Sequence, residues 1–285
     1  MYVAQPLDLR ADYLDAVSII VGLSLMLPKE LGANNLFPKD EHTEAWHISV
    51  LGEALELRKA AAITPEDVFG YGMLCYYNRK QNEEQWSHVV KFKWRTSFKS
   101  KEEEIFKVVQ ENGITNVPSL VRHDRLGSTA ELRDGLHHQA EPSGFPFRNH
   151  TCMCFVVTPI GLPLFTFRNS AELLVVLRDA IQAHRDVLQK ANILHRDVSG
   201  SNILINQSTR RGMLINFDVA IDLSQHTPTA RNIAGTLDYS AAGLLKENPY
   251  TYRHDGVIFL RFHPGSHAEG GPLTGEQPIY AVDGR

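Results

Sequence analysis

The chain has 285 residues, of which 43% are hydrophobic and 22% charged. This is the composition of a globular protein and excludes a disordered, collagen-like or disulfide-scaffold chain. Its 29 basic residues stand against 33 acidic ones, and the net charge of −4 excludes a nucleic-acid binder that works by bulk positive charge. The length suits one large domain or two coupled lobes.

In the N-terminal third, the predicted secondary structure changes from helix to strand near residue 63. Residues 1–62 read mostly as helix, and we expect a helical N-terminal extension there. Its apolar run, Ala16 to Leu27, is far shorter than the roughly 20 residues that span a bilayer, and it lacks the flanks of a signal peptide. It predicts a buried amphipathic helix, so no membrane partner is expected. From residue 63 onward, short β-rich runs on either side of the polar turn Asn78–Gln85 predict a hairpin.

A short helix and a long insertion follow. The run KEEEIFKVVQ, Lys101 to Gln110, has apolar residues at helical spacing behind an acidic first turn, and predicts the helix. Residues 122–150 are rich in His, Asp, Ser, Gly and Pro, and predict a surface loop insertion. Cys152 to Val157 then resumes as a buried strand. With Cys75, the cysteines of this strand make three, an odd number that indicates a reducing compartment, so we expect an intracellular protein, cytoplasmic or nuclear.

The second half of the chain is more helical. Ala171 to Ala191 is the longest helical pattern, and apolar strands are expected around 203–205 and 213–217. Strands followed by a helix and paired strands predict an α+β protein with two lobes. The β-rich N-lobe is assigned to residues 63–158 and the helical C-lobe to residues 159–255.

The sequence ILHRDVSGSNILI, Ile193 to Ile205, is the most informative motif. His195, Arg196 and Asp197 are followed by Asn202 and then by an apolar strand. This spacing resembles the HRDxxxxN catalytic loop of protein kinases, in which the aspartate accepts the proton of the substrate hydroxyl and the asparagine binds Mg²⁺.

Other kinase motifs appear in the order that this resemblance requires. In HVVKFKW, Lys91 follows two valines of a strand and resembles the lysine that holds the α and β phosphates. Glu102, the first of three consecutive glutamates, resembles the partner of that lysine, with the next two as close alternatives. Upstream, Gly70 and Gly72 resemble a remnant of the glycine-rich loop that covers the phosphates. These residues, with Asn202, form the predicted ATP-binding set.

Two motifs further along depart from the kinase pattern. Asn216, Phe217 and Asp218 stand where the metal-binding DFG motif is expected, and a neutral amide is a poorer ligand for Mg²⁺ than a carboxylate. If the chain stays extended after Ile215, residues two apart share a face, and Asp218 can reach the metal. The predicted metal ligands are therefore Asn202, Asn216 and Asp218.

The second departure lies in GTLDYSAAG, which resembles the end of a kinase activation segment but has Ala242 and Gly243 in place of Pro and Glu. Regulatory phosphorylation is a further hypothesis. Its hydroxyl candidates are Ser224, Thr227 and Thr229, with Arg196 as the phosphate partner.

Residues 160–255 resemble one family more closely, the fungal-type protein kinases. The similarity rests on PIGLPLFTF, ELLVVLRDAIQAHRDVLQKANILHRDVSGSNILI, LINFDVA, GTLDY and TYRHD. It implies an ATP- and Mg-dependent Ser/Thr-type kinase with a catalytic set of Lys91, Arg196 and Asp197. It also implies that Asp255 braces the catalytic loop from below. The glycines and prolines of residues 256–285 predict an irregular tail, hence a C-terminally truncated C-lobe. Its exposed apolar surface predicts either poor solubility or reliance on a partner that covers it.

Three interpretations stay open. The first is a protein kinase whose protein substrate is not legible from the sequence. The second is a pseudokinase scaffold that binds ATP without turnover, which Asn216 and Gly243 favour and the intact catalytic loop opposes. The third is a small-molecule phosphotransferase of the aminoglycoside-kinase type, which Asp218 suggests and Arg196 opposes.

Overall fold

A computed structural model describes residues 13–26, 45–50, 52–59, 61–62, 73–79, 83–96, 102–132, 149–225 and 251–255. The helices are α1 (Tyr13–Leu25), α2 (Glu102–Glu111), α3 (Thr129–Leu132), α4 (Ser170–Ala191) and α6 (Tyr252–Asp255), with 3₁₀ turns η1 (Leu164–Thr166) and η2 (Gly200–Asn202). The strands are β1 (Ala45–Val50), β2 (Glu53–Arg58), β3 (Leu74–Arg79), β4 (His88–Thr96), β5 (Ser119–Ser128), β6 (His150–Thr158), β7 (Gly161–Pro163), β8 (Ile193–Leu194), β9 (Ile203–Asn206), β10 (Gly212–Leu214) and β11 (Ile221–Asp222).

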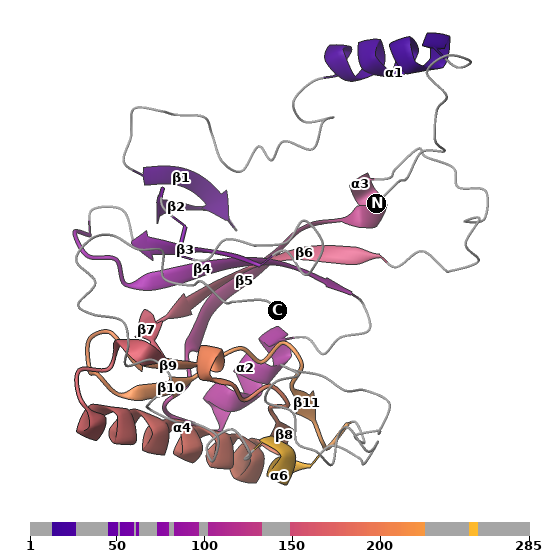
Figure 1. Ribbon diagram of the computed structural model, residues 1–285. Coiled ribbons are helices and arrows are strands. Elements are labelled where there is room, and N and C mark those ends of the chain that lie inside the picture. The colour runs from indigo at the N-terminus through magenta and orange to yellow at the C-terminus, as the bar shows by residue number, and fades with distance from the viewer. Residues whose placement is uncertain are drawn as a thin grey trace.

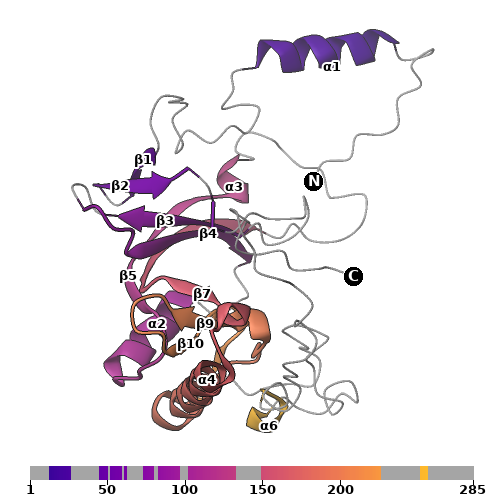
Figure 2. The same ribbon diagram turned by 60° about the vertical axis from the view of Figure 1, so that its left-hand side comes forward.

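The described elements form two layers that meet at one seam, so the α+β bilobal fold class is confirmed. The upper layer is an antiparallel six-stranded sheet in the order β1-β2-β3-β4-β6-β5. The lower layer holds α4, a three-stranded sheet in the order β10-β9-β7, and the β8-β11 pair. Figure 1 shows α4 along the bottom of the molecule, and Figure 2 shows β7, β9 and β10 between α4 and the large sheet. The last strand of the large sheet along the chain, β6, ends at Thr158.

Strand β4 divides its side chains between two faces of the large sheet. Val90 and Phe92 are buried in an apolar cluster with β1, β2 and β6. Because alternate residues of a strand point to opposite faces, Lys91 and Lys93 point together to the other face, toward α2. The alternation of side chains along β4 thus places Val90 and Phe92 in the core and Lys91 and Lys93 at the seam between the layers.

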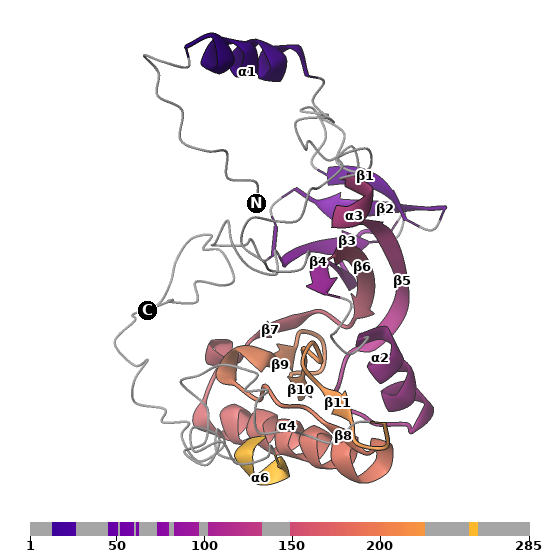
Figure 3. The ribbon, with the colours of Figure 1, turned by 90° about the vertical axis from the view of Figure 1, so that its right-hand side faces the viewer.

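Helix α4 supports the lower layer. Its N-cap, Asn169, accepts a hydrogen bond from the backbone N–H of Glu172 at 2.9 Å, and its C-cap, Asn192, is left-handed at φ 55°. Its inward face, which includes Val176 and Ala180, packs on β9 and β10. Helix α2 lies between this layer and the large sheet (Figure 3), where its apolar face packs against Phe217.

The predicted hairpin, the helix at 101–110, the strand at 152–157 and the helix at 171–191 are confirmed as β3-β4, α2, β6 and α4. The apolar strands after α4 are confirmed as β9 and β10, although β10 ends at Leu214 and the residues that follow turn. None of the helices among the described residues has the length and apolar character required to cross a membrane.

The expectation of a helical extension over residues 1–62 is wrong for residues 45–50 and 53–58. These residues form β1 and β2, whose burial alternates along each strand and whose backbones pair with each other. Helix α1 is present, but its apolar side chains are exposed, so its expected burial is also wrong. It stands apart from the other described elements in Figures 1–3.

The predicted loop insertion at residues 122–150 is wrong for residues 122–132. Strand β5 continues to Ser128 in antiparallel pairing with β6, and α3 follows it. Hydrogen bonding to a neighbouring strand outweighs a polar composition that reads locally as loop. Residues 133–148 and the predicted tail 256–285 lie outside the described residues.

Replacing Gly212 with Ala is expected to destabilise the protein by about 1–3 kcal/mol, as overpacking typically does. An added Cβ would lie 2.1 Å from the carbonyl oxygen of Val176, and this oxygen belongs to the backbone of α4, which cannot rotate away. Gly22→Ala in α1 is the control, since nothing lies within 4 Å of its added Cβ. Urea denaturation measures both variants, and equal midpoints would contradict the expectation.

Candidate functional site

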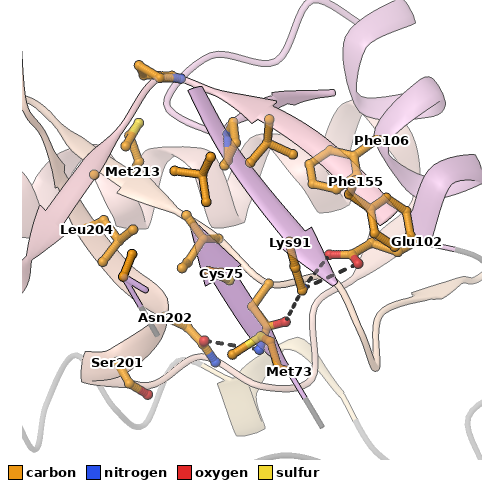
Figure 4. Close-up of a pocket in the computed structure, with 18 of the residues that line it drawn as sticks. Met73, Cys75, Lys91, Glu102, Phe106, Phe155, Ser201, Asn202, Leu204 and Met213 are labelled. Carbon is orange, nitrogen blue, oxygen red and sulfur yellow. Dashed lines mark hydrogen bonds and ion pairs between the residues drawn. The ribbon is translucent and has the colours of Figure 1, made fainter. Parts of the chain in front are cut away.

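A cavity of about 280 Å³ opens at the seam between the two layers. Residues of β3 and β4 line it from the large sheet, and residues of β9, β10 and the turns beside them line it from the lower layer (Figure 4). The wall is mostly apolar; burial raises the pKa of the Cys75 thiol to about 12, so this residue lines it as a neutral group. The polar groups that reach the cavity are Lys91, Glu102, Asp197, Ser201, Asn202 and Asn216.

Lys91 and Glu102 form the ion pair that the motif order predicts. The Nζ of Lys91 lies 3.3 Å and 3.4 Å from the two carboxylate oxygens of Glu102. Glu102 is the first residue of α2 and only 2% exposed, whereas Glu103 pairs with Arg95. Burial alone lowers the pKa of Lys91, but the carboxylates of Asp218 and Glu102 outweigh it and raise that pKa, so Lys91 is positively charged.

A second lysine, which the sequence analysis did not single out, joins this pair. Lys93 is 5% exposed, and its Nζ donates hydrogen bonds to Oε2 of Glu102 and Oδ1 of Asp218. The signal for it was present in HVVKFKW, because Lys93 is two residues after Lys91 in the same strand. Lys91, Lys93, Glu102 and Asp218 are called the four-charge cluster.

The chain turns at Asn216 and does not stay extended. Asn216 has φ 69°, a left-handed conformation that asparagine tolerates better than most residues. The physical reason predicted for the reach of Asp218 is therefore wrong, although Oδ1 of Asp218 does lie 3.0 Å from Nζ of Lys91. Oδ1 of Asn216 accepts from the same ammonium at 3.3 Å. Phe217 is fully buried against Phe106, with ring centroids 5.6 Å apart, and this packing anchors the turn.

Burial by itself would raise the pKa of Asp218. The ammonium groups of Lys91 and Lys93 outweigh burial and hold that pKa well below its usual range. Asp218 is therefore ionised. Burial raises the pKa of Glu102, and Lys91 opposes this shift. Each of the two lysines thus forms ion pairs with both carboxylates of the four-charge cluster.

The loop from His195 to Asn202 is held by hydrogen bonds. Nδ2 of Asn202 donates to the carbonyl oxygen of Asp197 at 2.7 Å and to its Oδ2 at 2.8 Å. Burial lowers the pKa of His195, so the ring is neutral. Its Nδ1 accepts from the backbone N–H of Asp197 at 3.2 Å, which leaves Nε2 to donate to the carbonyl of Ile215 at 3.0 Å. The half-buried carboxylate of Asp197 is thereby held at the cavity.

Asp255 braces this loop from the lower layer, as expected. Its Oδ2 accepts from the backbone N–H of Arg196 at 3.0 Å and lies 3.1 Å from Nε2 of His184 on α4. The ring of His184 stacks on Tyr252, with centroids 4.5 Å apart. Arg196 itself has φ 71°, so the loop is bent at the residue before Asp197.

Several predicted site residues cannot be placed. Gly70, Gly72, Thr227, Thr229 and Gly243 lie outside the described residues. Ser224, the remaining hydroxyl candidate, donates its hydroxyl to Asp222.

The three predicted metal ligands lie together, but one oxygen of each is already engaged. Oδ1 of Asn202 accepts from Nδ2 of Asn216 at 3.2 Å, and Oδ1 of Asn216 accepts from Lys91. Oδ1 of Asp218, the only carboxylate of the three, accepts from Lys91 and Lys93. Mg²⁺ requires oxygen ligands in near-octahedral geometry and is repelled by nearby ammonium groups. The described arrangement does not fit Mg²⁺.

Comparisons with known proteins identify a matching family and solved structures that are similar to this chain. The sequence profile of the family described as "Fungal protein kinase" matches residues 1–260. Among solved structures, the Cydia pomonella granulovirus kinase PK-1 is similar, with 16% identity and a TM-score of 0.48. The match covers 72% of this chain and 65% of PK-1, which is less than two thirds of that protein. No curated protein matches the chain.

Proposed function

This chain belongs to the fungal protein kinase family, and on that premise we propose that it uses ATP to phosphorylate a serine or threonine hydroxyl of another protein. Membership of the family supports a phosphotransferase of the kinase type. The observation that supports the rest is the convergence of Lys91, Asp197 and Asn202 on one mostly apolar cavity. Such a cavity suits a nucleotide, because its apolar walls can cover a base and its few polar groups can orient the phosphates.

The proposed roles follow from charge and position. Lys91 is positively charged and lines the cavity, so it binds the phosphates of ATP, and Glu102 holds its side chain in place. Asp197 accepts the proton of the substrate hydroxyl as that oxygen forms its bond to the γ-phosphorus and the bond to ADP breaks. Asn202 positions the carboxylate of Asp197. Gly70 and Gly72 are proposed to cover the phosphates.

A scaffold without turnover is the second candidate, and the four-charge cluster favours it. The first position of the DFG motif holds a neutral Asn216. The carboxylate two residues further along the chain, Asp218, is bonded to two lysines. Phosphoryl transfer depends largely on positive charge placed around the phosphates, and a divalent metal usually supplies much of it. The family membership favours a protein kinase over a small-molecule phosphotransferase.

We also propose an intracellular location and a protein partner for this chain. The described cysteines are free, which suits a reducing, intracellular compartment. A protein partner that covers the lower lobe is also proposed. Exposed Leu174 and Ile181 on the outer face of α4 support a partner there.

Replacing Lys91 with Met is expected to lower transfer of the γ-phosphoryl of ATP to a casein and histone mixture by about 100-fold or more. The reason is the loss of the Lys91 ammonium, which lines the cavity and is proposed to bind the phosphates. Label transfer from γ-³²P-ATP measures the effect. Lys107→Met is the matched control, because Lys107 is 73% exposed on α2, and it should keep the parent rate.

Three outcomes separate the candidates. Transfer that Lys91→Met abolishes supports the kinase. Thermal stabilisation by ATP without any transfer supports the scaffold. Transfer that survives Lys91→Met unchanged would overturn the assignment of this cavity.

A further inference from the structure

Lys93 is a buried cation that the proposed mechanism does not use. A buried ammonium is costly unless it is paired and hydrogen-bonded. Lys93 meets this condition by bonding two carboxylates at once, Glu102 from α2 and Asp218 from the turn after Asn216. It also lies over the ring of Phe155, with Nζ 5.1 Å from the ring centroid. Its position is therefore fixed by β4, β6, α2 and the turn together.

Lys93 does not line the cavity, but it changes the charge around Glu102, which does. With Lys91 as the only cation, Glu102 and Asp218 would leave the cluster with a formal charge of −1. Lys93 brings the formal charge of the four-charge cluster to zero. A nucleoside triphosphate is strongly anionic, and a negative wall would repel it unless a divalent cation were bound between them. The second lysine removes that repulsion without a metal.

The same contacts oppose metal binding at Asp218. Its Oδ1 already accepts from two ammonium groups, and Oδ1 of Asn216 accepts from one of them. A divalent ion placed on these oxygens would have to displace the lysines or approach them closely. Both alternatives are unfavourable, because the first breaks the ion pairs of the two lysines and the second brings like charges together.

We propose that Lys93 is a built-in counter-cation for Asp218 and Glu102, so that this cavity binds ATP without a divalent metal. The inference rests on the proposed function insofar as ATP is the ligand. It differs from that function because it concerns how the phosphates are neutralised and not whether the γ-phosphoryl is transferred.

The experiment compares ATP affinity in excess EDTA and in excess MgCl₂, measured by calorimetry on the full chain. For the parent protein we expect dissociation constants within about threefold of each other, since the charge is already balanced. For Lys93→Gln we expect affinity in EDTA to fall by about tenfold or more and to be recovered in MgCl₂. Lys93→Arg keeps the charge and should bind in EDTA as the parent does. Lys107→Gln is the surface control, expected to match the parent in both buffers.

The outcomes are distinct from those that test the proposed function. ATP binding by the parent that is lost in EDTA and restored by MgCl₂ would overturn the inference while the proposed function stands. Lys93→Gln binding in EDTA as tightly as the parent would overturn the role of Lys93. Absence of ATP binding in both buffers would sink the proposed function itself. The parent comparison needs no substitution, so it decides the question even if Lys93→Gln fails to fold.

Discussion

Asp197→Asn is expected to lower phosphoryl transfer by about 100- to 10,000-fold, the usual contribution of a positioned general base. The carboxylate of Asp197 lines the cavity and accepts a hydrogen bond from Asn202 at 2.8 Å. An amide of nearly the same shape can occupy that position, but it cannot take the proton of a substrate hydroxyl. Initial rates of label transfer at saturating ATP measure the loss.

The affinity for ATP separates this role from a structural one. The ion pair of Lys91 and Glu102 is untouched by the substitution, so we expect Asp197→Asn to bind ATP within about threefold of the parent. Asp15→Asn, in the exposed helix α1, is the isosteric control and should leave both quantities unchanged. A variant that keeps the parent rate would show that Asp197 is not the base.

Asp255→Ala is expected to destabilise the protein by about 2–4 kcal/mol, because it leaves two buried groups without their acceptor. Asp255 is 2% exposed, and its Oδ2 serves both the backbone N–H of Arg196 and Nε2 of His184. We also expect transfer to fall, since the bend that presents Asp197 is held by the bond to Arg196. Urea denaturation measures the free energy of unfolding.

The control for this substitution is Glu131→Ala. Glu131 pairs with Arg125, but both side chains are about half exposed, and water screens a surface pair of this kind, so it contributes little to stability. A large difference between the two variants is the expected result. If Asp255→Ala unfolds at the same urea concentration as Glu131→Ala, the brace contributes little.

The sequence located the catalytic loop because its chemistry is local. His195, Asp197 and Asn202 lie within eight consecutive residues, and the hydrogen bonds between them follow from that spacing. Helix α4 was legible for a similar reason, since its apolar stripe repeats at helical spacing along one segment. The sequence could not, by contrast, decide which of three consecutive glutamates pairs with Lys91. Glu102 is the partner because α2 begins at this residue, close to β4.

What the sequence by itself determined is the identity of the chemical groups and their order: a strand lysine, a helix glutamate, a catalytic loop and an altered metal motif. Only the tertiary structure decided how their charges are balanced. In the sequence, Lys93 looks like an ordinary strand lysine. In the structure it is bonded to Asp218, which lies 125 residues further along the chain. Strands β1 and β2 were missed likewise, because β1 pairs with β2 and β2 with β3, and this pairing stabilises them more than their own composition does. Contacts between distant segments set both outcomes, and no local pattern encodes such contacts.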